Sequence, residues 1–286
     1  MRLEIRNSPD AMPRFMISVS LHAVLAWMAL VSVSRGATMV PYVMPMTLPP
    51  PTAMVAMANA PIPVGAPRMA IREGHFAVGN KRIRIWGVNF SCGANFPVHA
   101  DAVHIAARLA AHGVNSVRFH DMDNAVFPEG IRDPRAPLGL SAEALDRLDY
   151  FIDQLARVGI YANLILHGGR ETSKLLNLPD PGLAADTMVD LFTPQLVDAQ
   201  RAYARDILGH TNAYRRVRYA DDPAVAFIEV SSEDSFFTGD ALGRLQAMPG
   251  FYGGILLGRY AAWLKARYGS TAGVRRAWAP DSAPVG

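Results

Sequence analysis

The stretch Pro223–Phe237, PAVAFIEVSSEDSFF, constrains the fold more than any other part of the chain, because an apolar strand pattern ends there in carboxylates. The residues alternate, so that Glu229 and Glu233 share one face and the alanine, isoleucine and valine side chains share the other. A strand of this kind suits a (β/α) barrel, whose helices cover the outer face and whose chemistry occurs at the C-terminal ends of the strands. We therefore expect Glu233, at the tip, to carry the chemistry.

Strand and helix patterns alternate along the rest of the chain, which implies right-handed βαβ crossovers and a parallel sheet. We predict an α/β fold of the TIM (β/α)8 type, with about four βα units. The predicted barrel strands are Ile83–Phe90, Asn115–His120, Ile160–Leu166 and the strand described above. The predicted helices are Asp101–His112, one capped by Ser141 and ended by Gly159, one capped by Thr193 that runs to Leu208, Gly254–Tyr268 and Ser270–Ala279. Gly79-Asn80 predicts a hairpin turn before the first of these strands.

The composition narrows the classes of function. Of 286 residues, 50% are hydrophobic and the formal net charge is +3, so the chain can bury a large core and is not drawn to a polyanion. The arginines are scattered rather than clustered with aromatic residues, which also argues against nucleic acid as a partner. A single cysteine, Cys92, excludes an intrachain disulfide and a cysteine-based metal site.

The N-terminal region predicts export. Arginines precede an apolar run over residues 15–34, which is long for a cleaved signal and just long enough to span a bilayer. We assign residues 1–37 to a signal peptide or signal anchor, 38–67 to a linker rich in proline, alanine and methionine, and 68–286 to the partial barrel. The protein is then secreted, periplasmic, or anchored in a membrane through residues 15–34 and facing outward.

Polar side chains converge at the ends of all four predicted strands. If the apolar side chains of each strand point outward, the alternate side chains point into the barrel. Buried polar groups there are costly unless they are paired, and so many of them are hard to explain as core packing. We therefore expect a site at this end of the sheet. The inward set is Asn89, Ser116, Arg118, His120, Asn163, His167, Glu229, Ser231 and Glu233.

Several of these residues have an alternative interpretation. Arg118 serves either as a substrate contact or as the partner of Glu229 in a structural ion pair. A histidine such as His120 is more often a satisfied core or loop residue than a catalytic one. His120, Asp121 and Asp123 suggest a metal, but strand alternation turns Asp121 away from His120, so we expect no metal site.

Several segments together resemble the cellulase-like glycoside hydrolases of family 5, in the clan of retaining (β/α)8-barrel enzymes. The similarity runs from about His75 to Ala279 in matching order and spacing. The segments that carry it are IRIWGVNFSCGANFP, GVNSVRFHDMD, LDYFIDQLARVGIYANLILH, RYADDPAVAFIEVSSEDSFF and WLKARYGSTAGVRRAWA.

The resemblance implies hydrolysis of O-glycosidic bonds in β-linked oligosaccharides or polysaccharides, without a cofactor. Glu233 then matches the general acid/base, while Arg118 and His167 match residues that line the site. We also place Asn89, His120 and Ser232 among the residues that bind substrate.

Two departures from the family pattern matter. Ser232 stands where the family has an asparagine that binds the sugar 2-hydroxyl, which predicts weaker catalysis. The family's nucleophile follows strand seven, and the four predicted strands do not include it, so we expect the chain to be the N-terminal half of a longer product.

Two other hypotheses remain. The chain is alternatively a non-catalytic, membrane-anchored remnant that binds carbohydrate through aromatic residues, although packing is the simpler role for most of them. Alternatively, two half-barrels pair as a homodimer. The aromatic residues concerned are Trp86, Phe90, Phe96, Phe236, Phe237 and Tyr252.

Overall fold

The computed structural model describes residues 59–182, 186–232, 234–237 and 240–278. All of these residues fall within one compact unit, residues 48–286. Glu233 and the apolar run over residues 15–34 lie outside the described residues. Among the helices of the described part, none has the length and apolar character needed to cross a bilayer.

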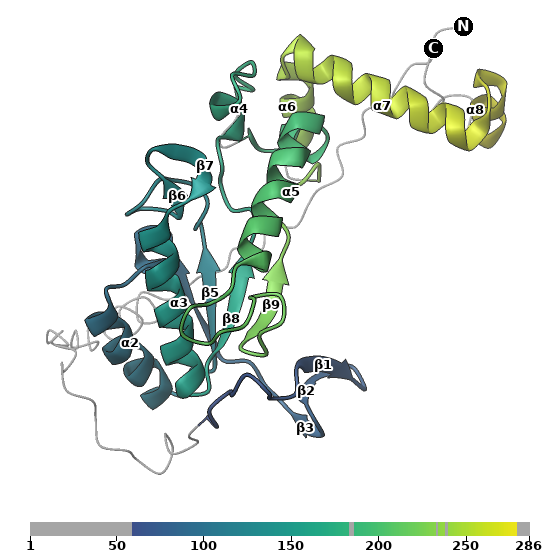
Figure 1. Ribbon diagram of the computed structural model, residues 1–286. Coiled ribbons are helices and arrows are strands. Elements are labelled where there is room, and N and C mark those ends of the chain that lie inside the picture. The colour runs from purple at the N-terminus through teal and green to yellow at the C-terminus, as the bar shows by residue number, and fades with distance from the viewer. Residues whose placement is uncertain (1–58, 183–185, 233, 238–239, 279–286) are drawn as a thin grey trace, which may run out of the picture. The chain divides into compact units, whose positions relative to one another are not determined.

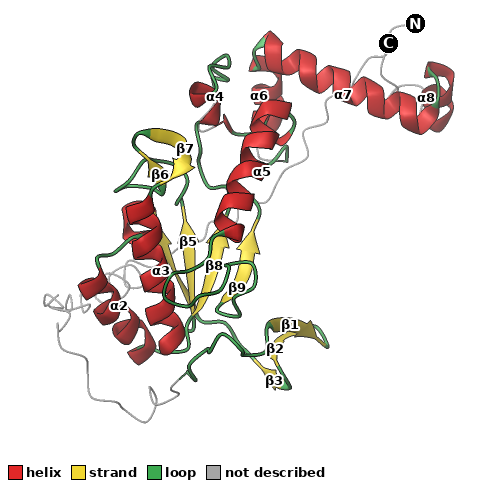
Figure 2. Cartoon of the chain, in the orientation of Figure 1, coloured by secondary structure: helices red, strands yellow, loops and turns green. Residues whose placement is uncertain are grey.

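Four parallel strands form the central sheet, in the order β4-β5-β8-β9, and helices separate them along the chain (Figures 1 and 2). This confirms the predicted α/β fold with four parallel strands, the arrangement of the first half of a (β/α)8 barrel. The strands are β4 (Gly87–Ser91), β5 (Ser116–His120), β8 (Tyr161–Ile165) and β9 (Val225–Glu229). The helices between them are α2 (His99–Ala111), α3 (Ala142–Arg157) and α5 (Pro194–Gly209).

The main core lies between the outward face of the sheet and these helices. Val117 and Phe119 of β5 are fully buried, as are Leu148 and Phe151 of α3. Phe119 and Phe151 meet edge to face with ring centroids 5.8 Å apart. The strand alternation of the sequence thus predicts correctly that Val117 and Phe119 of β5 face the helices, and it places Arg118 on the opposite face of the sheet.

Helix boundaries follow the capping residues. Ser141 accepts a hydrogen bond from the backbone N–H of Ala144 at the start of α3, as its position predicts. Thr193 precedes Pro194 at the start of α5 but makes no side-chain capping bond. Gly269 ends the helix before it with φ of 73°, a conformation that glycine adopts without steric cost.

The prediction that Ile83–Phe90 forms the first barrel strand is wrong in its extent. Lys81–Arg82 (β3) pairs instead with β2 (His75–Val78) across the predicted Gly79-Asn80 turn, and only Gly87–Ser91 joins the parallel sheet. A further strand, β1 (Met69–Arg72), completes a three-stranded antiparallel sheet. Phe76 of this sheet packs against Phe227 of β9, with ring centroids 5.1 Å apart.

The two helices predicted near the end of the chain are confirmed as α7 (Gly250–Tyr268) and α8 (Thr271–Ala277), with small differences at their ends. Other elements lie in segments that carry no clear period in the sequence, mostly in the loops at the C-terminal ends of the strands. They are η1 (Cys92–Asn95), β6 (Arg132–Asp133), β7 (Ala136–Leu140), α4 (Thr172–Leu175), η3 (Val189–Leu191) and α6 (Ala241–Ala247).

The last residues assigned to the linker pack against the domain. Ile62 is buried with Ala156, Tyr161 and Ala224, and its backbone N–H donates to the carbonyl of Ala156. The packed domain therefore begins before residue 68, at or before residue 62.

The prediction that helices cover the outward face of every strand is wrong for the C-terminal part of β9. Ile228 is 39% exposed and Val230 is 77% exposed. A register shift between Ala162 and Asn163 of β8 opposes one extra residue of β9, and β9 is the last strand of the sheet. Within the described residues β9 pairs with a strand on one side only, and such an edge is a surface on which further strands can pair.

Candidate functional site

Arg118 and Glu229 form the centre of a polar network on the inward face of the sheet. Arg118 Nε donates to Glu229 Oε1 at 2.9 Å, and its Nη2 donates to Glu229 Oε2 at 2.7 Å. Both side chains are about one-third exposed, at 32% and 33%. The hydrogen bonds from Arg118, against the opposing effect of burial, hold the pKa of Glu229 below its ordinary value. The two residues form the ion pair that the sequence analysis offered as one alternative for Arg118.

Neighbouring strands add their polar groups to this pair. Asn163 Nδ2 donates to Glu229 Oε1, and Arg118 donates to Asn89 Oδ1 at 3.1 Å and to Ser232 Oγ at 3.0 Å. Residues from β4, β5, β8 and the end of β9 are thus brought together, as the alternation predicts. Ser116 is buried at the start of β5, and Ser231 is exposed after β9.

His120 lies at the edge of the same network. Its Nε2 is 3.3 Å from Ser232 Oγ, and its Nδ1 is 3.0 Å from Asp121 Oδ2. The prediction that Asp121 turns away from His120 is therefore wrong. Strand alternation stops at His120, and Asp121 has a positive φ of 51°, which brings its carboxylate back to the imidazole.

Glu233 lies outside the described residues, but both of its neighbours are placed at the C-terminal end of the sheet. The backbone N–H of Ser232 donates to the carbonyl of His167 at 2.9 Å, which ties the segment after β9 to the segment after β8. The carboxylate of Asp234 accepts from the backbone N–H of Met188 at 2.7 Å.

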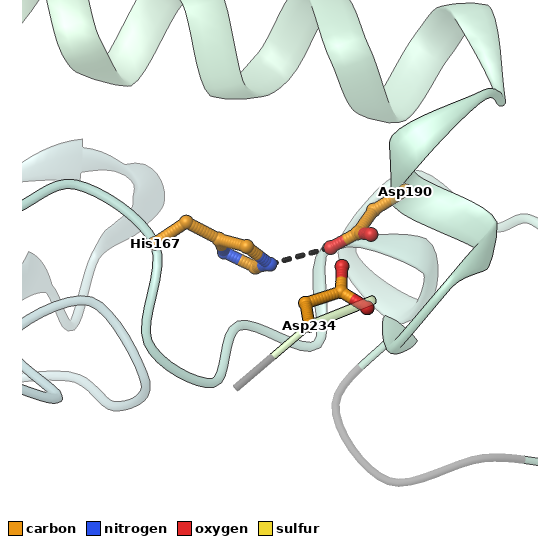
Figure 3. Close-up of side chains that lie close together, drawn as sticks. All are labelled: His167, Asp190 and Asp234. Carbon is orange, nitrogen blue, oxygen red and sulfur yellow. Dashed lines mark ion pairs between the residues drawn. The ribbon is translucent and has the colours of Figure 1, made fainter. Parts of the chain in front are cut away.

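A second cluster joins His167, Asp190 and Asp234, whose side chains point toward one another (Figure 3). His167 Nε2 lies 2.5 Å from Asp190 Oδ2 in an ion pair. Burial lowers the pKa of His167, but contacts with Asp123 and Asp190 outweigh it and raise the pKa to about 9. Burial and the neighbouring Asp190 carboxylate raise the pKa of Asp234 to about 7.

Packing fixes the position of Asp190 in η3. Val189, next to it, is fully buried in a small apolar cluster with Phe192, Leu196 of α5 and Tyr252 of α7. This cluster holds the short helix against α5, so that the Asp190 carboxylate faces the end of β8 (Figure 3).

Asp123 lies on the other side of the His167 ring. It is fully buried, and its Oδ2 is 3.4 Å from His167 Nδ1 and 3.0 Å from Arg170 Nε. The backbone N–H of Gly168 donates to its Oδ1 at 3.0 Å. Burial raises the pKa of Asp123, but His167 and Arg170 outweigh it and lower the pKa overall.

The strand pattern identifies His167 but not the aspartates around it. Asp123 stands in a sequence run whose alternation predicts no metal site, and Asp190 lies in a long loop without periodicity. The available signal was the density of aspartate in the segments that follow β5, β8 and β9, because those segments meet at one edge of a parallel sheet.

Most of the aromatic residues considered for sugar stacking serve in packing instead, as their simpler interpretation predicts. Phe96 and Tyr252 are buried, and Phe90 packs on Phe151. Trp86 is 68% exposed but precedes β4, at the opposite end of the sheet from the polar network. Phe237 is 96% exposed and follows β9.

No family model matches the sequence, and a search of curated proteins finds no match either. Among solved structures, the endo-1,4-β-mannanase from Rhizomucor miehei is 18% identical, with a TM-score of 0.47 over 63% of this chain and 51% of that one. A glycoside hydrolase family 5 mannosidase from the same organism, solved as a mutant with mannosyl-fructose, is 14% identical, with a TM-score of 0.48 over 64% of this chain and 53% of that one.

The endo-β-1,4-mannanase from Thermotoga petrophila is 16% identical, with a TM-score of 0.44 over 59% of this chain and 39% of that one. This chain thus spans about half the length, or less, of these solved structures. The mannosidase is itself a member of glycoside hydrolase family 5. These are likenesses of fold over part of each chain.

Proposed function

We propose that this chain belongs to an exported glycoside hydrolase that cleaves O-glycosidic bonds in β-linked glycans with retention of configuration. The observation that carries the proposal is the convergence of polar side chains from all four parallel strands on the inward face of the sheet, around Arg118 and Glu229, with Ser232 joining them from beyond the C-terminal end of β9. Active sites of (β/α) barrels are built at that end of the sheet.

Glu233 is the proposed general acid/base. Its neighbours Ser232 and Asp234 both contact residues at this end of the sheet, which supports placing Glu233 there too. In a retaining reaction the acid protonates the departing glycosidic oxygen, and its conjugate base then takes a proton from the attacking water.

The proposed mechanism needs a second carboxylate as nucleophile, roughly 5–5.5 Å from the first. Within the described residues, the strand that would supply it in a complete barrel is not among β4, β5, β8 and β9. We propose that further strands pair with the open edge at β9, where Ile228 and Val230 are exposed, and bring this carboxylate with them.

Ser232 is the proposed contact to the sugar 2-hydroxyl. Its Oγ already accepts from Arg118 Nη2 at 3.0 Å, and a serine side chain is shorter than the asparagine of the family pattern. Contact through a bridging water fits this geometry and predicts a slower enzyme, since bonds to the 2-hydroxyl strengthen in the transition state.

Hydrolysis of nitrophenyl β-glycosides, β-glucan and β-mannan tests the proposal, with the product anomer followed by NMR. Two forms of the protein are assayed. One is the 286-residue chain, and the other is this chain joined to any barrel strands that the DNA beyond codon 286 encodes. We expect retained configuration, loss of the rate in Glu233→Gln, and an unchanged rate in Glu143→Gln, a control at an exposed glutamate of α3.

Two results would overturn the proposal. One is the absence of hydrolysis in both forms of the protein, and the other is an equal rate in Glu233→Gln. If hydrolysis is absent but calorimetry detects binding of a β-glucan or β-mannan, the non-catalytic carbohydrate-binding role replaces the proposed one.

A further inference from the structure

The side chains of His167, Asp190 and Asp234 form a compact set of donors outside the Arg118–Glu229 network. One ligand atom from each residue lies within 4.8 Å of the others. They come from three separate segments, the end of β8, the helix η3 and the segment after β9 (Figure 3). The fold, not local sequence, therefore assembles this set.

His167 and Asp190 are buried, and some carboxylate oxygens of the set lack the hydrogen bonds that burial ordinarily requires. The side chain of Asp190 is only 2% exposed; its Oδ2 is paired with His167 Nε2 at 2.5 Å, and its Oδ1 accepts no hydrogen bond from the described residues. Oδ2 of Asp234 is likewise buried and accepts no hydrogen bond. Buried polar atoms without partners are rare, and an ion is one of the explanations for them.

The surroundings of His167 favour coordination through Nε2. Asp123 lies on the Nδ1 side of the ring at 3.4 Å, and Arg170 and Gly168 hold that carboxylate in place. At metal sites a carboxylate commonly accepts a hydrogen bond from the second ring nitrogen; here Asp123 stands in that position, but His167 Nδ1 makes no hydrogen bond to it at this distance. His167 Nε2 faces both Asp190 and Asp234 (Figure 3).

Charge balance points the same way. Arg170 offsets Asp123, whereas two carboxylates, Asp190 and Asp234, surround a single imidazole. A divalent cation on a neutral imidazole and two carboxylates gives a neutral site.

We propose that His167, Asp190 and Asp234 bind one divalent transition-metal ion, Zn²⁺ or Mn²⁺. Imidazole with two carboxylates is a donor set that suits these ions. In a tetrahedral site, ligand distances of about 2.0–2.2 Å place the donors about 3.3–3.6 Å apart, so a set whose atoms lie within 4.8 Å of one another must adjust by up to about 1 Å. The inference does not depend on the proposed hydrolysis, because none of the three residues is assigned to bond cleavage.

Calorimetric titration of the full chain, stripped with a chelator, tests the site with Zn²⁺ alone and Mn²⁺ alone. We expect one bound ion per chain, and weakening by tenfold or more in Asp190→Asn and in Asp234→Asn. We expect Asp123→Asn, which alters only the carboxylate behind His167, to weaken binding by about 10–100-fold. Asp221→Asn, at an exposed aspartate paired with Arg218, is the matched control and should bind like the parent chain.

Circular dichroism of each variant separates loss of binding from loss of fold. Asp234 is only partly buried, so Asp234→Asn keeps the test decisive if the buried Asp190→Asn variant does not fold. The Mn²⁺ signal in electron paramagnetic resonance gives a second readout, since the free-ion spectrum decreases on binding. No saturable binding of either ion, or equal affinity in folded Asp234→Asn and Asp221→Asn, would overturn the proposal.

Discussion

The hydroxyls of Tyr219 and Tyr214 offer a matched measurement of how burial controls the strength of a hydrogen bond in this fold. Each donates to an aspartate Oδ1 at 2.6 Å, Tyr219 to Asp149 and Tyr214 to Asp146. Tyr219 is fully buried, whereas Tyr214 is 39% exposed. The change to phenylalanine removes the same single oxygen at both positions.

The buried site has no replacement for the lost donor. Asp149 is 1% exposed and keeps only His210 and the backbone N–H of Ala213 as donors to its carboxylate. A hydrogen bond to a charged group contributes about 1.5–3 kcal/mol, so Tyr219→Phe should lower the free energy of unfolding by about 2 kcal/mol. In a domain of this size that corresponds to a Tm lower by roughly 4–8 °C. Water replaces the donor at Asp146, so Tyr214→Phe should cost less than about 0.5 kcal/mol.

Urea denaturation followed by circular dichroism, with both variants and the parent chain in the same buffer, measures the difference. Equal losses in the two variants would refute the argument, because burial is the feature that separates them. A loss in Tyr214→Phe larger than in Tyr219→Phe would refute it more strongly.

Three further predictions follow from the same structure. Ser232→Asn should raise kcat on a β-glycoside by roughly tenfold, about 1.4 kcal/mol of transition-state stabilisation, with little change in KM; an unchanged kcat would remove the role proposed for this position. Because the folded-state pKa of Glu229 is lowered, its stabilising effect is present above its ordinary pKa of 4.5 and is lost as pH falls through the lower folded value. In urea titrations from pH 6 downward, the free energy of unfolding should therefore fall more steeply in the parent chain than in Glu229→Gln. Parallel curves for the two proteins would contradict this. Leu148→Ala, in the core, should cost about 2–5 kcal/mol in urea denaturation, whereas Leu257→Ala, 68% exposed on α7, should cost less than about 0.5; similar costs would contradict the placement of the core.

The sequence predicts the sheet well because strand alternation is strict where one face is buried. Val117 and Phe119 had to face helices, so Arg118 had to face the other way, toward Asn89 and Glu229. The same rule fails one residue after β5 ends. Asp121 takes a positive φ there, and a pattern with a period of two holds no information about a loop.

The aspartates around His167 could not be predicted from periodicity for a related reason. The position of Asp190 depends on the packing of Val189 against Tyr252, which is near it only in the folded chain. A sequence pattern identifies which face of an element is buried. It does not identify which loop packs against the end of which strand, so the position of Asp190 beside His167 could not be predicted from the pattern.

The two polar clusters at the C-terminal end of the sheet differ in how far their groups are paired. Around Arg118, the Glu229 carboxylate accepts from two guanidinium nitrogens and from Asn163, so its interactions are made within the protein. Around His167, the buried Asp190 is paired with the imidazole through Oδ2, and its Oδ1 accepts no hydrogen bond from the described residues. Because a buried carboxylate oxygen without a hydrogen bond is costly, a ligand should stabilise the second cluster more than the first. Zn²⁺ should therefore raise the Tm of the parent chain and of Glu229→Gln by similar amounts, and should leave the Tm of Asp234→Asn almost unchanged.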